Sequence, residues 1–334
     1  MVSPRMGQGS GMRTSKELKF WALVFVAVCL VSCTEPAHMV GIGTTKGSST
    51  GQVSTAIAKV VSARGDLQVR TQPMAGTIQY VPSVNAGQLE FGVANIAQLT
   101  FAVEGKALFE GHPNPHLRMV ATLMPFRVGL LVAQDSDIHS VADLKGKTVP
   151  SGFRAAPLFK VLFEGFLATG KLSYEDVRQV PVSGRAQMWE LFMQGKVPTS
   201  IVTLGDAGAM QMEAALGGVR YLSFDNSPQA LEALNKHVPG TSFELMRPAP
   251  GLTGLVAPTN LMYYDYTLFA GKDVPDQWVH LVVQALYEDA EGLRITGPLW
   301  AEFTIQGMSK DVGLEYHPGA IRFYQEMGIW PDPM

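Results

Sequence analysis

The segment Gly41–Gly51 constrains the fold of this chain more than any other. It reads Gly-Ile-Gly-Thr-Thr-Lys-Gly-Ser-Ser-Thr-Gly, and the apolar residues Val53, Ile57, Val60 and Val61 follow it at helical spacing. Glycine lets the backbone turn sharply and approach a ligand closely. Free N–H groups at the amino end of a helix favour an anion. The segment therefore predicts a strand, a tight loop and a helix that together hold a small anion.

Strand-like and helix-like patterns alternate along the rest of the chain. The apolar patterns predict strands over 40–44, 66–72, 91–95, 117–123, 128–133, 147–150 and 197–204. They predict helices over 53–61, 76–86, 157–168, 185–194, 275–287 and 317–327, a short helical turn at 141–144, and a helix capped by Asp206. This alternation is typical of an α/β fold in which crossover helices cover the faces of a sheet.

The length of the chain favours two lobes. No linker-like segment separates them, so we expect the chain to cross between the lobes and return. The apolar segments 126–133 and 252–260 suit those crossings. We therefore expect lobe 1 to comprise 38–127 plus 256–334, and lobe 2 to comprise 128–255.

Residues 1–32 are typical of an export signal. Basic residues precede the apolar run 20–31, which is too short to span a bilayer. The run ends in Leu-Val-Ser-Cys, which matches the bacterial lipoprotein box and predicts lipidation of Cys33. Ordinary signal cleavage, with Cys33 incidental, is the alternative. Residues 1–11 look like an upstream extension, with Met12 as a second possible start.

Composition excludes several function classes. Both cysteines, Cys29 and Cys33, lie in or beside the signal, so the exported domain has no disulfide or cysteine metal site. The net charge is −3, and cleavage would make it more negative by removing four basic residues and one acidic residue. A nucleic-acid partner is not expected, because phosphate binding needs a basic face. No metal-binding motif occurs, and we expect neither metal nor cofactor.

Two loops are predicted to hold the ligand. The first contributes Thr44, Gly47, Ser48, Ser49, Thr50 and Gly51. The second, 151–157, also lies between a strand and a helix and contributes Gly152 and Arg154. An arginine can bind a carboxylate through two hydrogen bonds, although Arg154 could equally be a solvated surface residue. Lys46 is expected to be solvated.

Ends of strands supply three further candidates. Gly76 and Thr77 open the helix after the second strand, and Asn95 ends the third strand. Ligands of α/β sheets bind at such ends. Capping by Thr77 and a turn role for Asn95 are the alternatives.

A serine hydrolase is the alternative from another class. Gly47–Gly51 fits the G-x-S-x-G nucleophile elbow, with Ser49 as nucleophile. His317 could serve as the histidine, but no acid partner is evident and the loop follows the first strand rather than a later one. We therefore expect a protein that is not an enzyme.

Four segments resemble the TAXI family of solute-binding proteins, which serve tripartite ATP-independent periplasmic (TRAP) transporters. They are 42–51; 76–78 with 87–95; 138–149 with Ser151-Gly152; and 317–320 with 324–328. The chain departs from the family pattern in a longer first loop at Thr45-Lys46, in Val53-Ser54, in Tyr80 and in Phe153-Arg154.

The resemblance implies a two-lobed periplasmic-binding-protein fold of type II, with the ligand cleft between lobes joined by crossing strands. It also implies a periplasmic receptor that captures a glutamate-like or oxoglutarate-like carboxylate and delivers it to TRAP permease subunits in the membrane. The lipoprotein box at Cys33 adds a lipid anchor to this expectation. A sensory or orphan binding protein of the same fold is the alternative within this class.

Overall fold

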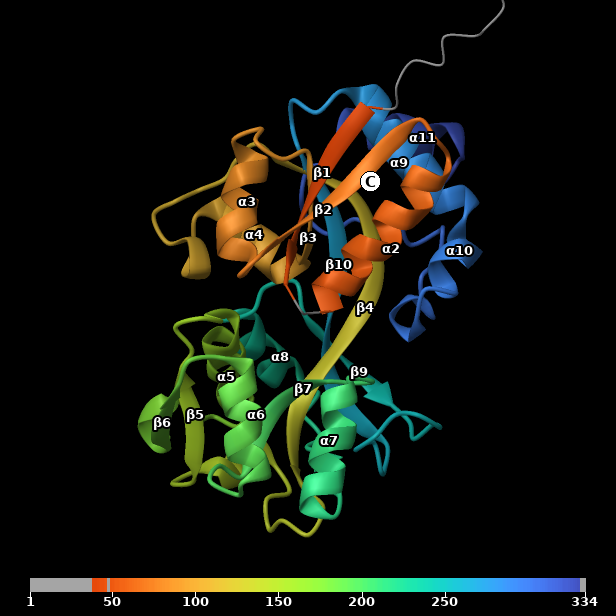
Figure 1. Ribbon diagram of the computed structural model, residues 1–334. Helices are drawn as coiled ribbons and strands as arrows, with labels where there is room; N and C mark the ends of the chain where they lie inside the picture. Colours follow the sequence, from red (N-terminus) through yellow and green to blue (C-terminus); the bar gives the residue numbers. More distant parts are fainter. Residues whose placement is uncertain (1–37, 47–48, 331–334) are drawn as a thin grey trace, which may run out of the picture. The chain divides into compact units, whose positions relative to one another are not determined.

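A mixed sheet of eight strands forms the centre of the fold (Figure 1). Its main path runs β2-β1-β3-β10-β4-β7, while β8 pairs with β4 and β9 with β10. The strands are β1 His38–Thr45, β2 Leu67–Met74, β3 Phe91–Asn95, β4 Leu117–Ala133, β7 Thr199–Thr203, β8 Val219–Tyr221, β9 Ser242–Met246 and β10 Thr259–Gly271. A separate parallel pair consists of β5 Thr148–Gly152 and β6 Arg178–Val182.

The computed structural model describes residues 38–46 and 49–330. The predicted signal segment, Cys33, Gly47 and Ser48 lie outside the described residues. The described residues form one unit by their internal contacts.

Helices flank the strands. They are α2 Ser49–Ala63, α3 Thr77–Asn85, α4 Ile96–Glu104, α5 Leu158–Thr169, α6 Arg185–Met193, α7 Ala207–Leu216, α8 Pro228–Asn235, α9 Asp276–Glu288, α10 Ala290–Arg294 and α11 Pro318–Glu326. Short 3-10 turns occur at η1 Ala107–Phe109, η2 Val141–Leu144, η3 Tyr174–Asp176 and η4 Pro298–Trp300. The helices that the patterns predict are confirmed, including the cap of α7, where the Asp206 carboxylate accepts from the Gly208 N–H at 2.8 Å.

Two long antiparallel strands, β4 and β10, run through both halves of the sheet. At one end β10 pairs with β3 through 266–270; at the other it pairs with β9 through 259–263. The second half of β4 pairs with β7 and β8. In Figure 1 these two strands connect the group of elements around β1–β3 with the group around β5–β7.

The expected break between strands 117–123 and 128–133 is wrong, because β4 is continuous through Pro125. Proline normally interrupts a central strand because it has no N–H to donate. Here Pro125 lies opposite Asp265 of β10, while β7 pairs only with 128–132. Within 38–46 and 49–330, no strand pairs with the other side of β4 at Pro125, so the missing donor disrupts no ladder there.

The prediction that residues 252–260 form an extended crossing between the lobes is also wrong. Turns at Leu252 and Leu255 occupy most of it, and β10 begins only at Thr259. The apolar composition of this segment misled the expectation, because β10 itself makes the return. The lobe boundaries predicted from the sequence stay a prediction.

A buried arginine joins β4 to two other parts of the chain. Arg127 is 9% exposed; it donates from Nε to Glu244 Oε2 on β9 at 2.9 Å and from Nη2 to Glu302 Oε2, beyond η4, at 2.7 Å. Burial lowers the pKa of Arg127, but its bonds to Glu302 and Glu244 raise that pKa above the ordinary value. The guanidinium therefore stays charged and joins the middle of β4 to β9 and to the segment that follows η4.

Replacing Arg127 by methionine should lower the free energy of unfolding by about 2 kcal/mol, because two glutamates lose charge-assisted hydrogen bonds. Urea denaturation measures the change. Arg64→Met is the matched control, since Arg64 pairs with Glu288 at the surface and such pairs contribute about 1 kcal/mol or less. Equal losses in the two variants would contradict a structural role for the Arg127 cluster.

Candidate functional site

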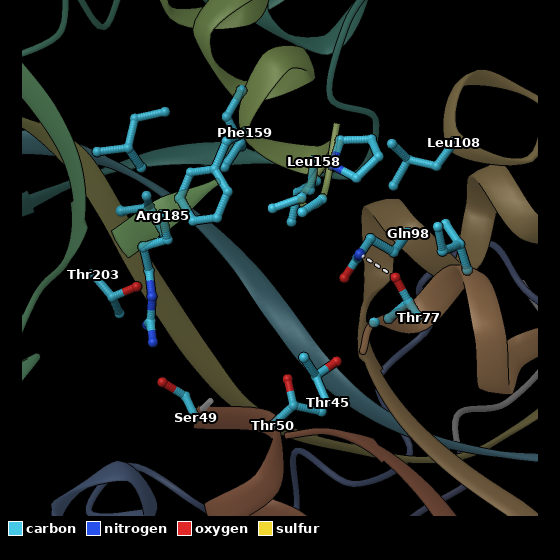
Figure 2. Close-up of a pocket in the computed structure, with 18 of the residues that line it drawn as sticks. Thr45, Ser49, Thr50, Thr77, Gln98, Leu108, Leu158, Phe159, Arg185 and Thr203 are labelled. Carbon is cyan, nitrogen blue, oxygen red and sulfur yellow. Dashed lines mark hydrogen bonds between the residues drawn. The ribbon is translucent and has the colours of Figure 1, made fainter. Parts of the chain in front are cut away.

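A cavity of about 290 Å³ opens at the carboxyl ends of the strands (Figure 2). Each of six strands leads into a helix whose amino end reaches the lining. The contributing residues are Ser49 and Thr50 of α2, Thr77 of α3, Gln98 of α4, Leu158 of α5, Arg185 of α6 and the α7 cap Asp206. Helix amino ends carry a partial positive charge, so the cavity favours a negatively charged group.

The crossing strands form the floor of the cavity. Phe126 of β4 stacks on Tyr266 of β10, with ring centroids 4.0 Å apart, and Tyr264 lies beside them. The Tyr266 hydroxyl is 3.1 Å from Thr50 Oγ1 in the first turn of α2. Burial raises the pKa of Tyr266, so its hydroxyl remains neutral and can donate or accept a hydrogen bond.

A relay of polar side chains positions one wall. Asn95 Oδ1 accepts from the Gln98 N–H at 2.9 Å and caps α4, while Asn95 Nδ2 donates to Gln98 Oε1 at 2.9 Å. Gln98 Nε2 in turn donates to Thr77 Oγ1 at 2.7 Å. Gln98 and Thr77 line the cavity, and Asn95, which is fully buried behind them, fixes the orientation of the Gln98 amide.

Arg185 brings a positive charge into the lining. It is the first residue of α6, and its guanidinium carbon lies 4.7 Å from the centre of the Trp189 ring. Asp206 Oδ2 is 3.6 Å from Arg185 Nη1. The Trp189 indole donates from Nε1 to the Ile201 carbonyl at 3.1 Å, which fixes the surface on which Arg185 rests. In Figure 2 the Arg185 side chain points toward Ser49.

The structure brings part of the predicted site together. Four of the predicted residues line the cavity: Ser49, Thr50, Gly76 and Thr77. Five described residues do not: Thr44, Gly51, Asn95, Gly152 and Arg154. Lys46, expected to be solvated, is exposed at the cavity lining. A binding role for every predicted residue stays a prediction.

The positions of the non-lining residues have physical reasons. Thr44 is buried, and its Oγ1 has no hydrogen-bond partner among the described residues. Gly152 adopts φ +85°, a left-handed turn conformation that favours glycine, and Arg154 after it is exposed. The turn thus directs Arg154 away from the lining, and Arg185 is the arginine that reaches it.

Sequence reasoning missed Arg185, Gln98 and, in the aromatic floor, Phe126. A signal for Arg185 existed: it begins the predicted helix 185–194, so it occupies the same strand–loop–helix position as Ser49. Gln98 follows Asn95 by three residues, a spacing typical of a helix start. For the floor, the sequence Tyr-Tyr-Asp-Tyr at 263–266 suits either a stacking wall or tyrosines at a surface strand edge, and the structure places Tyr264 and Tyr266, both buried, in the lining. Phe126 gave no signal, because it falls in the break expected between strands 117–123 and 128–133.

Two departures from the TAXI pattern are core residues. Tyr80 is fully buried, and its hydroxyl donates to the Val93 carbonyl at 2.6 Å. Phe153 is fully buried and stacks on Phe163 and on Phe159, with centroids 5.7 and 5.9 Å apart. Neither side chain lines the cavity, although Phe153 supports Phe159, which does.

The two residues suggested for a serine hydrolase, Ser49 and His317, lie in different surroundings. Ser49 lines the cavity, whereas His317 is fully buried and is not part of the lining. His317 caps α11, with its Nδ1 accepting from the Gly319 N–H at 3.2 Å, and burial lowers its pKa. This histidine therefore has a structural role, and the arrangement gives no support to a Ser49–His317 pair.

The sheet order, the crossing strands and a cavity at the strand ends define the mixed α/β, two-lobed fold of periplasmic solute-binding proteins, which confirms the predicted fold class. A solved structure described as a periplasmic transporter has a TM-score of 0.55 at 14% identity, covering 88% of this chain and 94% of that one. A binding protein component of an ABC phosphonate transporter from Pseudomonas aeruginosa has a TM-score of 0.53 at 11% identity, covering 88% and 87%.

The chain belongs to the NMT1-like family, whose model matches residues 42–328. The match spans all the strands except the start of β1, and every described residue of the cavity. The expected TAXI membership is not confirmed by this match. Among the described residues, the helices are too short or too polar to cross a membrane.

Replacing Asn95 by alanine should lower the free energy of unfolding by about 1 kcal/mol, because α4 loses its cap. Asn95→Ser is the matched variant: serine can still cap the helix, but it is too short to hold the Gln98 amide. Thermal unfolding of both variants measures the difference. Equal destabilisation by serine and alanine would show that the cap is not what Asn95 contributes.

Proposed function

We propose that this protein is an extracytoplasmic receptor that binds a small anionic solute in the cavity and delivers it to a membrane transporter. The convergence of six helix amino ends on one cavity carries this proposal. A helix amino end with N–H groups facing the cavity contributes about 0.3–1 kcal/mol toward binding a negative charge. The end of α7 contributes less, because the Asp206 carboxylate already accepts from the Gly208 N–H there. The fold, which is that of solute-binding proteins, and the export signal expected from residues 1–32 support the same function.

The binding step uses helices that follow strands of the central sheet and helices that follow the separate β5–β6 pair. Thr50, Thr77 and Gln98 reach the cavity from helices after β1, β2 and β3, whereas Leu158 and Arg185 reach it from helices after β5 and β6. A solute that contacts both sets stabilises the arrangement in which they face each other, since only that arrangement offers all the contacts. β4 and β10 would then act as the hinge.

The solute class and the transporter belong to the proposal. A carboxylate fits the hydroxyl and amide donors near α2 and α3, and the resemblance to TAXI proteins names a TRAP permease as the partner. The Pseudomonas aeruginosa neighbour serves an ABC phosphonate transporter, so a phosphonate is the competing head group. A lipid anchor at Cys33 would keep the receptor beside its permease.

A thermal-shift screen tests the receptor function. Glutamate, oxoglutarate, acetate, methylphosphonate and aryl monocarboxylates are added singly to the purified full-length protein. At 100 times its dissociation constant, a cognate ligand adds about 2.7 kcal/mol of stability and raises Tm by several degrees. If no anion in a broad set raises Tm, the receptor proposal is wrong.

Ser49→Ala should weaken binding of the best anion about five-fold, because one hydrogen bond contributes about 1 kcal/mol. Calorimetry measures the affinity. Ser83→Ala, on α3 and outside the cavity lining, is the control and should bind like the wild type. Unchanged affinity in Ser49→Ala would remove α2 from the binding site.

A further inference from the structure

The cavity is chemically one-sided. Leu158, Phe159 and Leu162 of α5 line one side together with Pro157, and Phe126, Tyr264 and Tyr266 of the crossing strands line the floor. In Figure 2, Leu158 and Phe159 lie across the cavity from Thr45 and Thr50. Ligand sites of this kind bury an apolar body and orient it with a few polar groups.

We infer that the solute has a single anionic head group, held at Arg185, and an apolar body the size of one ring. This inference rests on the proposed receptor function and narrows its solute class. The expected solute is then a monoanion such as an arylacetate or an arylsulfonate. It is not a dicarboxylate such as glutamate or oxoglutarate.

The loop before α5 is occupied by its own hydrogen bonds. The N–H groups of Phe153, Ala155 and Ala156 donate to the carbonyls of Val182, Ser183 and Phe153 at 2.8, 2.8 and 3.0 Å. Pro157 has no N–H, and the Phe159 N–H donates to Ala156 at 3.1 Å. These groups are therefore committed within the protein, and this side offers carbon rather than donors for a second carboxylate.

The charges of the lining point the same way. Besides Arg185, Lys46 is the only basic residue among the described residues of the lining, and it is exposed. Solvent screens an exposed charge and leaves its contribution small. Asp206 lies 3.6 Å from Arg185 and holds it while adding a negative charge. A second anionic group on the solute would lose its hydration and gain only the exposed Lys46 as a counter-charge.

Aromatic stacking supports the apolar wall. Phe159 stacks on the fully buried Phe153, and Phe126 stacks on Tyr266. A volume of about 290 Å³ lies at the lower limit of the range for small-molecule pockets, roughly 300–1,000 Å³. The small volume and the aromatic lining both suit a solute whose apolar part is a single flat ring. Aromatic side chains favour offset-stacked or edge-to-face contacts with another ring.

Calorimetry on the full-length protein tests the inference with matched probes. Phenylacetate and phenylmethanesulfonate carry one charge on a ring, phenylacetamide removes the charge, phenylmalonate doubles it, and phenylalanine adds an ammonium group. Oxoglutarate and glutamate carry two carboxylates without a ring. We expect one of the two ring monoanions to bind at least 10-fold more tightly than every other probe.

Arginine variants locate the head group. Arg185→Met should weaken the best ring monoanion at least 10-fold and abolish its preference over phenylacetamide, whereas Arg185→Lys should keep part of that preference. Arg178→Met, on the exposed surface of β6, is the control and should bind normally. Circular dichroism and Tm of each variant verify that it is folded.

Three outcomes overturn the inference. If oxoglutarate or glutamate binds most tightly, the solute has two anionic groups and the receptor function stands. If Arg154→Met loses as much affinity as Arg185→Met, the head group belongs to the loop predicted from the sequence. If none of the probes binds and no anion in the broad screen raises Tm, both the inference and the receptor function fail.

Discussion

The pairing of β4 with β10 is the constraint on which the rest of the structure depends. These strands hydrogen-bond from Leu117 to Val128 and continue into β3 on one side and β7 and β9 on the other. Their aromatic side chains form the cavity floor, so the ladder sets the position of the site. Arg127 of β4 adds ion pairs with Glu244 and Glu302 beside this ladder. The sheet thus supplies the floor of the cavity, and the strand-to-helix connections supply the polar and charged residues of its lining.

The site combines two kinds of interaction with different reach. Arg185 and the amino ends of α2 and α3 favour a negatively charged group near them, which selects for the sign of the solute's charge. The hydroxyls of Thr50 and Thr77, the Gln98 amide and the α5 wall act only at contact distance, which selects for shape. Asn95 and Phe153 act behind the lining and Asp206 lies within it beside Arg185, so these three residues fix the orientation of the contact residues.

Periodicity predicted most elements, since a buried strand or helix face leaves a pattern in the sequence. It failed where local preference and tertiary pairing disagree, as at Pro125, whose missing donor is harmless only because β7 ends its pairing at 128. The binding site was predicted only in part, because the sequence shows local turns but not the direction in which a turn sends the chain. Ser49 and Thr77 follow glycine-rich turns, whereas the choice between Arg154 and Arg185 depends on how the Gly152 turn directs the chain. Residue type alone carries no information on that direction.

The six strand-to-helix connections that surround the cavity form none of the ladder hydrogen bonds: four follow strands of the central sheet, and two follow the separate β5–β6 pair. A substitution in one of them changes one wall and leaves strand pairing intact, because loops of α/β folds tolerate change that strands do not. Phe159 and Arg185 belong to different connections, so body size and head-group charge can be altered one at a time. Solute preference in this chain is therefore modular, and it can diverge among descendants of the gene without first sacrificing the stability of the fold.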